Sequence, residues 1–307
     1  MAVAELEFEG TLSAKPESQF SIVWRRFRRH KLALICGGMI LLLIILSALA
    51  PVIAPYDPVR DQEITNRNAR PSLQHLMGTD EIGRDVLSRL LYAGRISLTV
   101  SFVVTFLTEI FGAFIGAISG YYGGWVDNLI QRTTEFLITL PLLPLLLAFS
   151  AILRGVRIPG LAEEWSSTVI VIFVLTAFGW MGPCRLARGM VLSLREREFA
   201  EASRALGMSD LGIIVRHMLP NSLPPLIVDA TLGLGGYIIL ESALSFLGFG
   251  IQPPVATWGN MLADYQRDMW LQPLKVFFPG LAIFVASLSF NYVGDGLRDA
   301  IDPRLKL

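Results

Sequence analysis

Three acidic residues lie inside long apolar runs of the sequence: Glu109, Asp229 and Glu241. A carboxylate is costly at such a place, so it must face protein or water, where it could line a pathway, carry an ion or bond across an interface. Asp229 and Glu241 are twelve residues apart. That separation turns a helix by roughly 120°, so these two do not share a face. We therefore treat all three acids as candidate pathway or interface residues.

The chain offers no cluster of residues suited to catalysis or to a bound metal. Its three histidines, His30, His75 and His217, are scattered. His75 has two acids nearby in sequence, Asp80 and Asp85, but one histidine with two carboxylates is a weak ligand set. None of the four lysines lies in the Gly-x-x-x-x-Gly-Lys-Ser/Thr pattern of a phosphate-binding loop. We expect no catalytic residue, metal or cofactor here, so any ATPase must be a separate subunit.

The composition is that of a polytopic membrane protein. Of 307 residues, 53% are hydrophobic and 17% charged, with a mean hydropathy of +0.54. A net charge of zero, and no basic tract beyond the N-terminal one, gives no support for nucleic-acid binding. Six apolar runs are long enough to cross a bilayer as helices: about 32–50, 96–119, 133–153, 166–186, 224–249 and 274–292. The sequence predicts an all-α membrane protein with about six spans.

Charge placement predicts the orientation of the chain. Five basic residues precede the first run: Arg25, Arg26, Arg28, Arg29 and Lys31. By the positive-inside rule, residues 1–31 form a cytoplasmic tail and 32–50 the first transmembrane helix. A cleaved signal peptide is the alternative, because Ala48-Leu49-Ala50 resembles a cleavage site. The run exceeds the usual length of about 7 to 15 residues, which favours a retained span.

The remaining segments follow from counting crossings. Residues 51–95 are expected to form an extracytoplasmic loop, and 96–294 the transmembrane core. Four crossings return the chain to the cytoplasm at 195–220, an arginine-rich segment, as the positive-inside rule requires. Residues 295–307 are expected to be a cytoplasmic tail, so both termini lie inside.

Prolines are expected to shape two of the spans. Pro141 and Pro144 should bend the third, which follows a short loop at 121–131. Pro224 and Pro225 suit the first turn of the fifth.

Glycines and tryptophans suggest how the spans pack. Gly112, Gly116 and Gly120 recur every four residues, a spacing that lets helices approach closely in lipid. Trp258 and Trp270 are placed as aromatic residues of the membrane interface would be.

The polar island at 195–220 predicts a helix-turn-helix. Residues 195–206 lack a helix breaker and place Phe199, Ala202 and Leu206 on one face. Gly207 can take the left-handed turn that ends a helix, and Ser209 with Asp210 can cap the next one. That second helix, 211–218, should be separated from the following run by Pro220.

The same island resembles the EAA loop of the membrane subunits of ABC importers. The residues that match are Glu201, Ala202, Ser203, Gly207, His217, Leu219 and Pro220. In that family the loop forms the coupling helix that docks into a groove on the ATPase subunit. Ser203 stands where a second alanine is usual, and His217 where isoleucine is common. Neither change alters the helix-turn-helix, because serine is small and His217 can still pack.

Three further motifs resemble the dipeptide, oligopeptide and nickel branch of these permeases, in particular its C-type subunit. They are HxxGTDxxGRDVxSR at 75–89, ESALSFLGFGIQPPxxxWGNML at 241–262 and GDGLRDxxDPR at 294–304. With the EAA loop, the resemblance covers most of the chain beyond residue 70. It implies the type I importer fold and alternating access in the inner membrane. The implied partners are a related permease, expected as a heterodimer, two ATPase subunits that bind ATP and Mg, an extracytoplasmic solute-binding protein, and lipid.

A self-contained channel or ion-coupled carrier, with the three intramembrane acids as ion sites, is the rival interpretation. It predicts inverted repeats between the two halves of the chain, and none is evident. A membrane enzyme would need a cluster of reactive residues, which the sequence does not offer. The transported solute stays open between peptide, nickel, opine and sugar.

Overall fold

The computed structural model describes residues 19–302, without the side chains of residues 19, 20, 163 and 164. In chain order the helices are α2 (Gln19–Phe27), α3 (Lys31–Ala48), α4 (Ala50–Ile53), η1 (Ile64–Asn66), α5 (Val86–Tyr122), α6 (Gly124–Thr139), α7 (Leu142–Leu153), α8 (Glu163–Gly179), α9 (Met181–Leu194), α10 (Glu198–Ala205), α11 (Asp210–Ile213), η2 (Ile214–Met218), α12 (Leu219–Phe246), α13 (Trp258–Tyr265), η3 (Gln266–Asp268) and α14 (Pro273–Ile301). No named strand occurs among these described residues.

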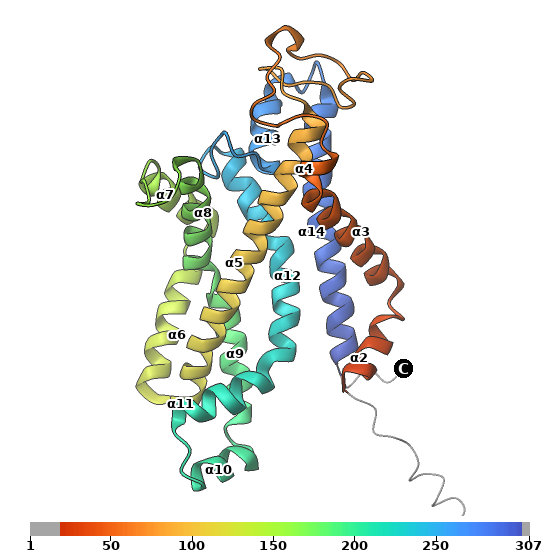
Figure 1. Cartoon of the computed structure of the whole chain (residues 1–307). Helices are drawn as coiled ribbons and strands as arrows, with labels where there is room; N and C mark the ends of the chain where they lie inside the picture. Colours follow the sequence, from red (N-terminus) through yellow and green to blue (C-terminus); the bar gives the residue numbers. More distant parts are fainter. Residues whose placement is uncertain (1–18, 303–307) are drawn as a thin grey trace, which may run out of the picture.

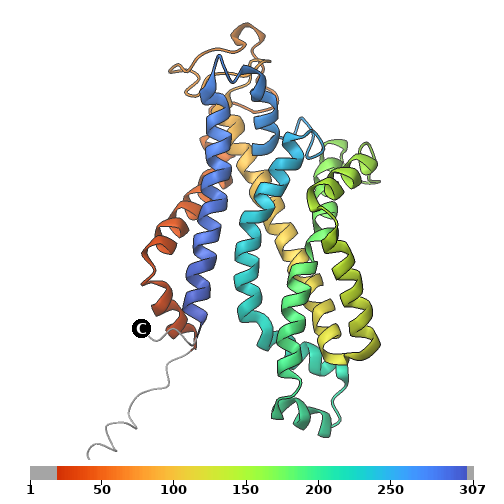
Figure 2. The same cartoon turned by 180° about the vertical axis from the view of Figure 1, so that it is seen from behind.

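Five helical stretches are long and apolar enough to cross a membrane: α3, α5, residues 165–194, residues 210–246 and α14. The pair α6 and α7, bent by 92°, would make a sixth. The prediction of an all-α membrane protein with about six spans is confirmed. Two opposite views place α2, α3 and α14 on one side and α6 to α9 on the other, with α12 between them (Figures 1 and 2). Helix α5 crosses from one group to the other.

Helix α5 is the central element and packs most extensively against α9. A Cβ at Gly112 would lie 2.5 Å from the carbonyl oxygen of Trp180, and one at Gly120 would lie 2.8 Å from that of Arg188. Gly116 stands closer still to the backbone of α9, at the carbonyl oxygen of Cys184. The close packing predicted for this glycine row is confirmed.

The structure moves the boundaries of the second and third spans. Helix α5 begins at Val86 rather than near residue 96, because the Asp85 side chain caps it by accepting from the Ser88 amide. Residues 86–95 therefore belong to the helix. The expected loop at 121–131 is also wrong, because a single glycine, Gly123 with φ 64°, separates α5 from α6.

The prolines bear out the prediction at one place and contradict it at another. The bend expected in the third span is present as a break at Leu140 and Pro141, where the axes of α6 and α7 diverge by 92°, whereas Pro144 lies inside α7. The fifth span begins earlier than expected, so Pro224 and Pro225 lie inside α12.

The expected tails are partly helical and packed. Residues 1–18 and 303–307 lie outside the described residues, but α2 contacts α14. The Arg26 side chain donates to the carbonyl oxygen of Asp302 at 2.9 Å. The expected C-terminal tail is, as far as residue 301, the last part of α14. Helix α2 and the end of α14 lie at the same end of the molecule as α10 (Figure 1).

The opposite end carries a cap, which we define as residues 54–85 together with α13 (Figure 1). The Asp80 carboxylate accepts from Arg84 Nε at 2.7 Å and from Arg89 at 2.6 Å. Arg89 is 2% exposed and also donates to Asp264 at 3.1 Å. Burial raises the pKa of Asp80, but the charges of Arg89 and Arg84 outweigh it and hold the pKa below its usual range. This cluster joins the GTDxxGRD motif to α5 and α13.

Replacing Asp80 with alanine should therefore destabilise the cap strongly. Removing one member of a buried ion pair typically costs about 3 to 5 kcal/mol, because the partner charge stays buried. The contribution of Asp80 is present above its unfolded pKa near 4 and is lost as pH falls through the lowered folded value. We expect a large drop in thermal midpoint at pH 7, measured by tryptophan fluorescence. The neighbouring Glu81→Gln, at an exposed position, is the control; equal midpoints for both variants would contradict the assignment.

Candidate functional site

The helix-turn-helix predicted at 195–220 is present at the end opposite the cap. Helix α10 covers 198–205, somewhat shorter than expected. Gly207 adopts φ +76° and ends the helix, and the Ser209 side chain caps α11 by accepting from the Gly212 amide. The roles predicted for Gly207 and Ser209 are confirmed.

The apolar face of α10 points away from the protein. Phe199 is 37% exposed and Leu206 is 87% exposed. The opposite face, with Ala200 and Ser203, is buried against an apolar cluster that includes Ile213. An exposed apolar face on a polar segment is typical of a surface that binds another protein.

The residues of the EAA-like sequence divide between these two faces. Glu201 and Ala202 are exposed and lie on the outer side of α10. The Ser203 hydroxyl donates to the Phe199 carbonyl oxygen at 2.7 Å. Serine therefore satisfies its own polar group inside the helix, which explains why it can replace alanine there.

The second helix does not stop at Pro220, contrary to the sequence prediction. Helix α11 continues through η2, a wider π-type turn, directly into α12. The Leu219 amide bonds to Ile214, five residues back, and this wider turn accommodates the proline ring that a regular helix would exclude. His217 is half-buried, and its ring lies 6.2 Å from that of Phe199. The packing expected for His217 is confirmed.

A polar contact braces the turn against the end of α5. The Tyr121 hydroxyl donates to Asp210 at 2.8 Å and accepts from Arg204 Nε at 3.4 Å. The Arg204 guanidinium also lies over the Tyr121 ring, and Arg195 donates to the Gly120 carbonyl oxygen at 3.0 Å. Sequence reasoning missed Tyr121, because its partners are more than 80 residues away.

Of the three intramembrane acids, Glu241 is structural. It is 0% exposed and accepts from the hydroxyls of Ser245 at 2.7 Å and Ser97 at 3.2 Å. Ser97 also accepts from the Trp258 amide, so the cluster joins α5, α12 and α13. Glu241, one of the predicted pathway or interface residues, lies in the interior of this chain, where it joins its own helices.

Glu109 and Asp229, in contrast, are brought together. Glu109 on α5 and Asp229 on α12 are both half-buried, and their carboxyl groups interact with one another. Within the described part of the chain, Glu109 Oε2 is buried without a hydrogen-bond partner. Asp229 also lines a cavity of about 420 Å³ with Leu186 and Arg298. The two acids thus remain candidates for contact with a solute or a partner.

The other expected polar sites resolve into structural contacts. Asp80 is held by two arginines, and His75 lies 3.0 Å from Asp85. In residues 19–302 no group of three potential ligands could hold a metal ion. Trp258 is 2% exposed and its indole donates to the Leu90 carbonyl oxygen, so its expected interfacial place is wrong, whereas Trp270 is 88% exposed.

Comparison with known proteins gives a consistent result. Residues 112–307 match the family described as "Binding-protein-dependent transport system inner membrane component". Residues 18–71 match the "N-terminal TM domain of oligopeptide transport permease C".

Curated relatives cover nearly the whole chain. The dipeptide transport system permease protein DppC of Alkalihalophilus pseudofirmus is 40% identical over 300 residues, which is 96% of this chain and 95% of that protein. The glutathione transport system permease proteins GsiD of Escherichia coli and of Shigella sonnei are each 41% identical over 283 residues, 92% of this chain and 90% of theirs. The chain therefore belongs to the inner-membrane permease family of binding-protein-dependent ABC importers.

Proposed function

We propose that this permease passes short peptides and that its α10–α11 turn couples transport to ATP hydrolysis in a partner. Two relatives support the substrate class, because one is named for dipeptides and the other for glutathione, itself a tripeptide. The coupling role is inferred from the exposed apolar face of α10, which offers a binding surface for a partner.

The importer would contain more than this chain. We expect a related permease, with which it forms a heterodimer, two ATPase subunits that bind ATP and Mg, and an extracytoplasmic solute-binding protein. In alternating access, the ATPase can drive movement only if it binds two conformations of the permease with different affinities. We expect the surface around Glu201 and Leu206 to make the contacts that differ between these conformations.

The bracing of the turn gives a route for the movement. Tyr121 joins the turn to α5, which spans 37 residues and reaches the cap. A helix of that length is about 55 Å long. A displacement at α10 would thus be carried by one continuous element to the opposite end of the molecule.

Orientation is part of the proposal. The arginine-rich α2 and the turn lie at one end, and the cap lies at the other (Figure 1). We place the turn in the cytoplasm and the cap outside, in agreement with the positive-inside rule.

Labelling of single cysteines in intact cells tests this orientation. Leu73→Cys replaces a side chain that is 98% exposed in the cap, so an impermeant maleimide should label it. Ser209→Cys in the turn should be labelled only after the cells are opened. Labelling of Ser209→Cys from outside would overturn both the orientation and the coupling role.

Charge reversal on α10 and strain in the turn test the coupling. Glu201→Lys should weaken ATPase binding, because losing one member of a desolvated charge pair costs about 2 to 5 kcal/mol. Gly207→Val should do the same, since a β-branched residue resists φ +76°, whereas Gly207→Asn tolerates that conformation and should be mild.

The measurements are ATP-dependent dipeptide uptake in proteoliposomes and ATPase retained on purification. Glu198→Lys, also exposed on α10, is the charge control. If Glu201→Lys and Gly207→Val import peptide normally with the ATPase bound, the turn is only a linker. Uptake that persists without any ATPase would instead favour an ion-coupled carrier, with the adjacent Glu109 and Asp229 as its ion site.

The contact between the turn and α5 can be tested by removing one oxygen. Tyr121→Phe keeps the ring but loses both hydrogen bonds of the hydroxyl, each with a net value of about 1 kcal/mol. We expect uptake to fall several-fold while the ATPase stays bound and hydrolyses ATP. Tyr122→Phe, at a neighbouring side chain that is 51% exposed, should transport normally. Equal uptake by both variants would exclude Tyr121 from the coupling route.

A further inference from the structure

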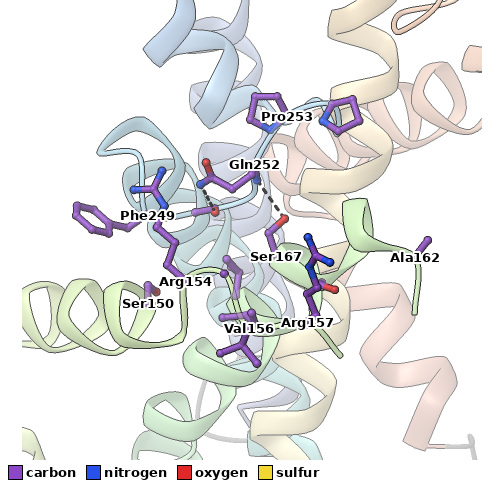
Figure 3. A pocket seen from close by; sticks show the side chains of 15 residues that line it. Ser150, Arg154, Val156, Arg157, Ala162, Ser167, Phe249, Gln252 and Pro253 are labelled. Atoms are coloured by element: carbon purple, nitrogen blue, oxygen red, sulfur yellow. Dashed lines mark hydrogen bonds between the residues drawn. The ribbon is translucent and has the colours of Figure 1, made fainter. Parts of the chain in front are cut away.

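A pocket of about 730 Å³ opens near the cap end of the helices (Figure 3). Its walls come from the end of α7, the 154–162 segment, the start of α8 and residues 249–254. The break at Pro141 places it there, because α7 turns away from α6 and lies beside the start of α8 (Figure 1). The pocket is therefore a product of the broken third span.

Two serine hydroxyls in this pocket are buried without partners. Ser150 on α7 is 3% exposed and Ser166 on α8 is 5% exposed, and both line the pocket. Neither hydroxyl oxygen has a hydrogen-bond partner within the described residues. Serine in a helix commonly bonds a carbonyl oxygen one turn earlier, and a buried hydroxyl without any bond is costly. Both hydroxyl groups therefore keep an unused donor in the wall of the pocket.

Among the described residues that line the pocket, the charged side chains are those of Arg154 and Arg157. The Arg154 guanidinium lies 6.0 Å from the centre of the Phe249 ring. Guanidinium groups bind carboxylates in a planar, bidentate way. Together with the serines, they make the pocket suited to an organic anion.

The wall beside the arginines is internally bonded. The Gln252 amide donates to the Ser167 hydroxyl at 3.2 Å, and its side-chain nitrogen donates to the Gly250 carbonyl oxygen at 2.9 Å (Figure 3). Ile170 and Val171 add apolar surface. A volume of 730 Å³ falls within the range of about 300 to 1,000 Å³ common for small-molecule sites. A short peptide would fit, with its carboxylate on the polar side and a side chain on the apolar side.

We propose that this pocket holds the carboxylate of a short peptide before it passes between the spans, with Arg154, Ser150 and Ser166 as the contacts. The inference rests on the proposed function for its substrate class and adds a site to it. The proposed role of this pocket differs from that of the Glu109–Asp229 pair, because two carboxyl groups are suited to a neutral or cationic group and not to a carboxylate.

Protection of an introduced cysteine tests the site directly. Val156→Cys replaces a pocket residue that is 47% exposed, and the native Cys36 and Cys184 are buried. The assembled importer, in nanodiscs of phosphatidylcholine and without the binding protein, is treated with a maleimide. We expect alanylalanine at about 2 mM to slow labelling about fivefold, as a dissociation constant of about 0.5 mM would. Its C-terminal amide should have little effect.

Substitution of the arginine completes the design. In the Val156→Cys background, Arg154→Gln should abolish the protection and Arg154→Lys should keep part of it. Arg132→Gln, at a side chain that is 86% exposed on α6, is the matched control and should leave protection unchanged. Retained protection in Arg154→Gln, or equal protection by the acid and the amide, would overturn the proposal.

The remaining outcomes identify what else could occupy the pocket. Protection by phosphatidylglycerol nanodiscs alone, with no effect of peptide, would assign a lipid phosphate and reject the peptide. A cysteine that is never labelled in the assembled importer would mean that another subunit covers the pocket, and would also reject the proposal. Peptide uptake by the unmodified importer distinguishes the two proposals. If the importer takes up peptide but peptide does not slow labelling of the cysteine, only the proposed pocket is rejected. If the importer takes up no peptide, the proposed substrate class is rejected.

Discussion

Close backbone contact between α5 and α9 is the constraint on which the rest of the structure depends. In lipid no hydrophobic driving force draws helices together, so association needs small residues that let backbones meet. The row Gly112, Gly116 and Gly120 supplies them along one face of α5. Because α5 also contacts α3, α8 and α12, its position decides where the cap and the α10–α11 turn lie relative to the spans.

Buried polar groups hold the cap and the neighbouring spans in one arrangement. At the cap, Arg89 pairs with two carboxylates, although its Nε has no partner among the described residues, and deeper in the spans Glu241 accepts from serine hydroxyls. Such groups are costly unless fully bonded, so they specify one arrangement of α5, α12 and α13. The hydroxyls of Ser150, Ser166, Thr105, Thr168 and Thr176 are also buried without partners in the described part of the chain, and of these five the two serines line the proposed peptide pocket.

The sequence predicted what local chemistry controls. The number of spans, the glycine row, the turn at Gly207 and the cap at Ser209 all follow from short-range signals, and the structure agrees. It was wrong at Pro220 and silent on the partners of Glu241, because distant residues decide both. Pro220 stays helical because a wider turn precedes it, and Glu241 is interior because hydroxyls from α5 reach it. The meeting of Glu109 with Asp229 depends on how α5 and α12 pack, which no spacing within either helix reveals.

The two faces of α10 explain how one short helix could both bind a partner and move the spans. Its inner face, with Ala200 and Ser203, is packed against apolar residues, so α10 cannot shift without moving them. Its outer face leaves Leu206 exposed, so a partner has apolar surface to bind. Tyr121 links this unit to α5 but not to α12, which joins the turn by a continuous backbone. A push on α10 therefore reaches α5 through side chains and α12 through the main chain. Unequal movement of these two helices would change the separation of Glu109 and Asp229, which places the acid pair where the proposed coupling acts on the spans.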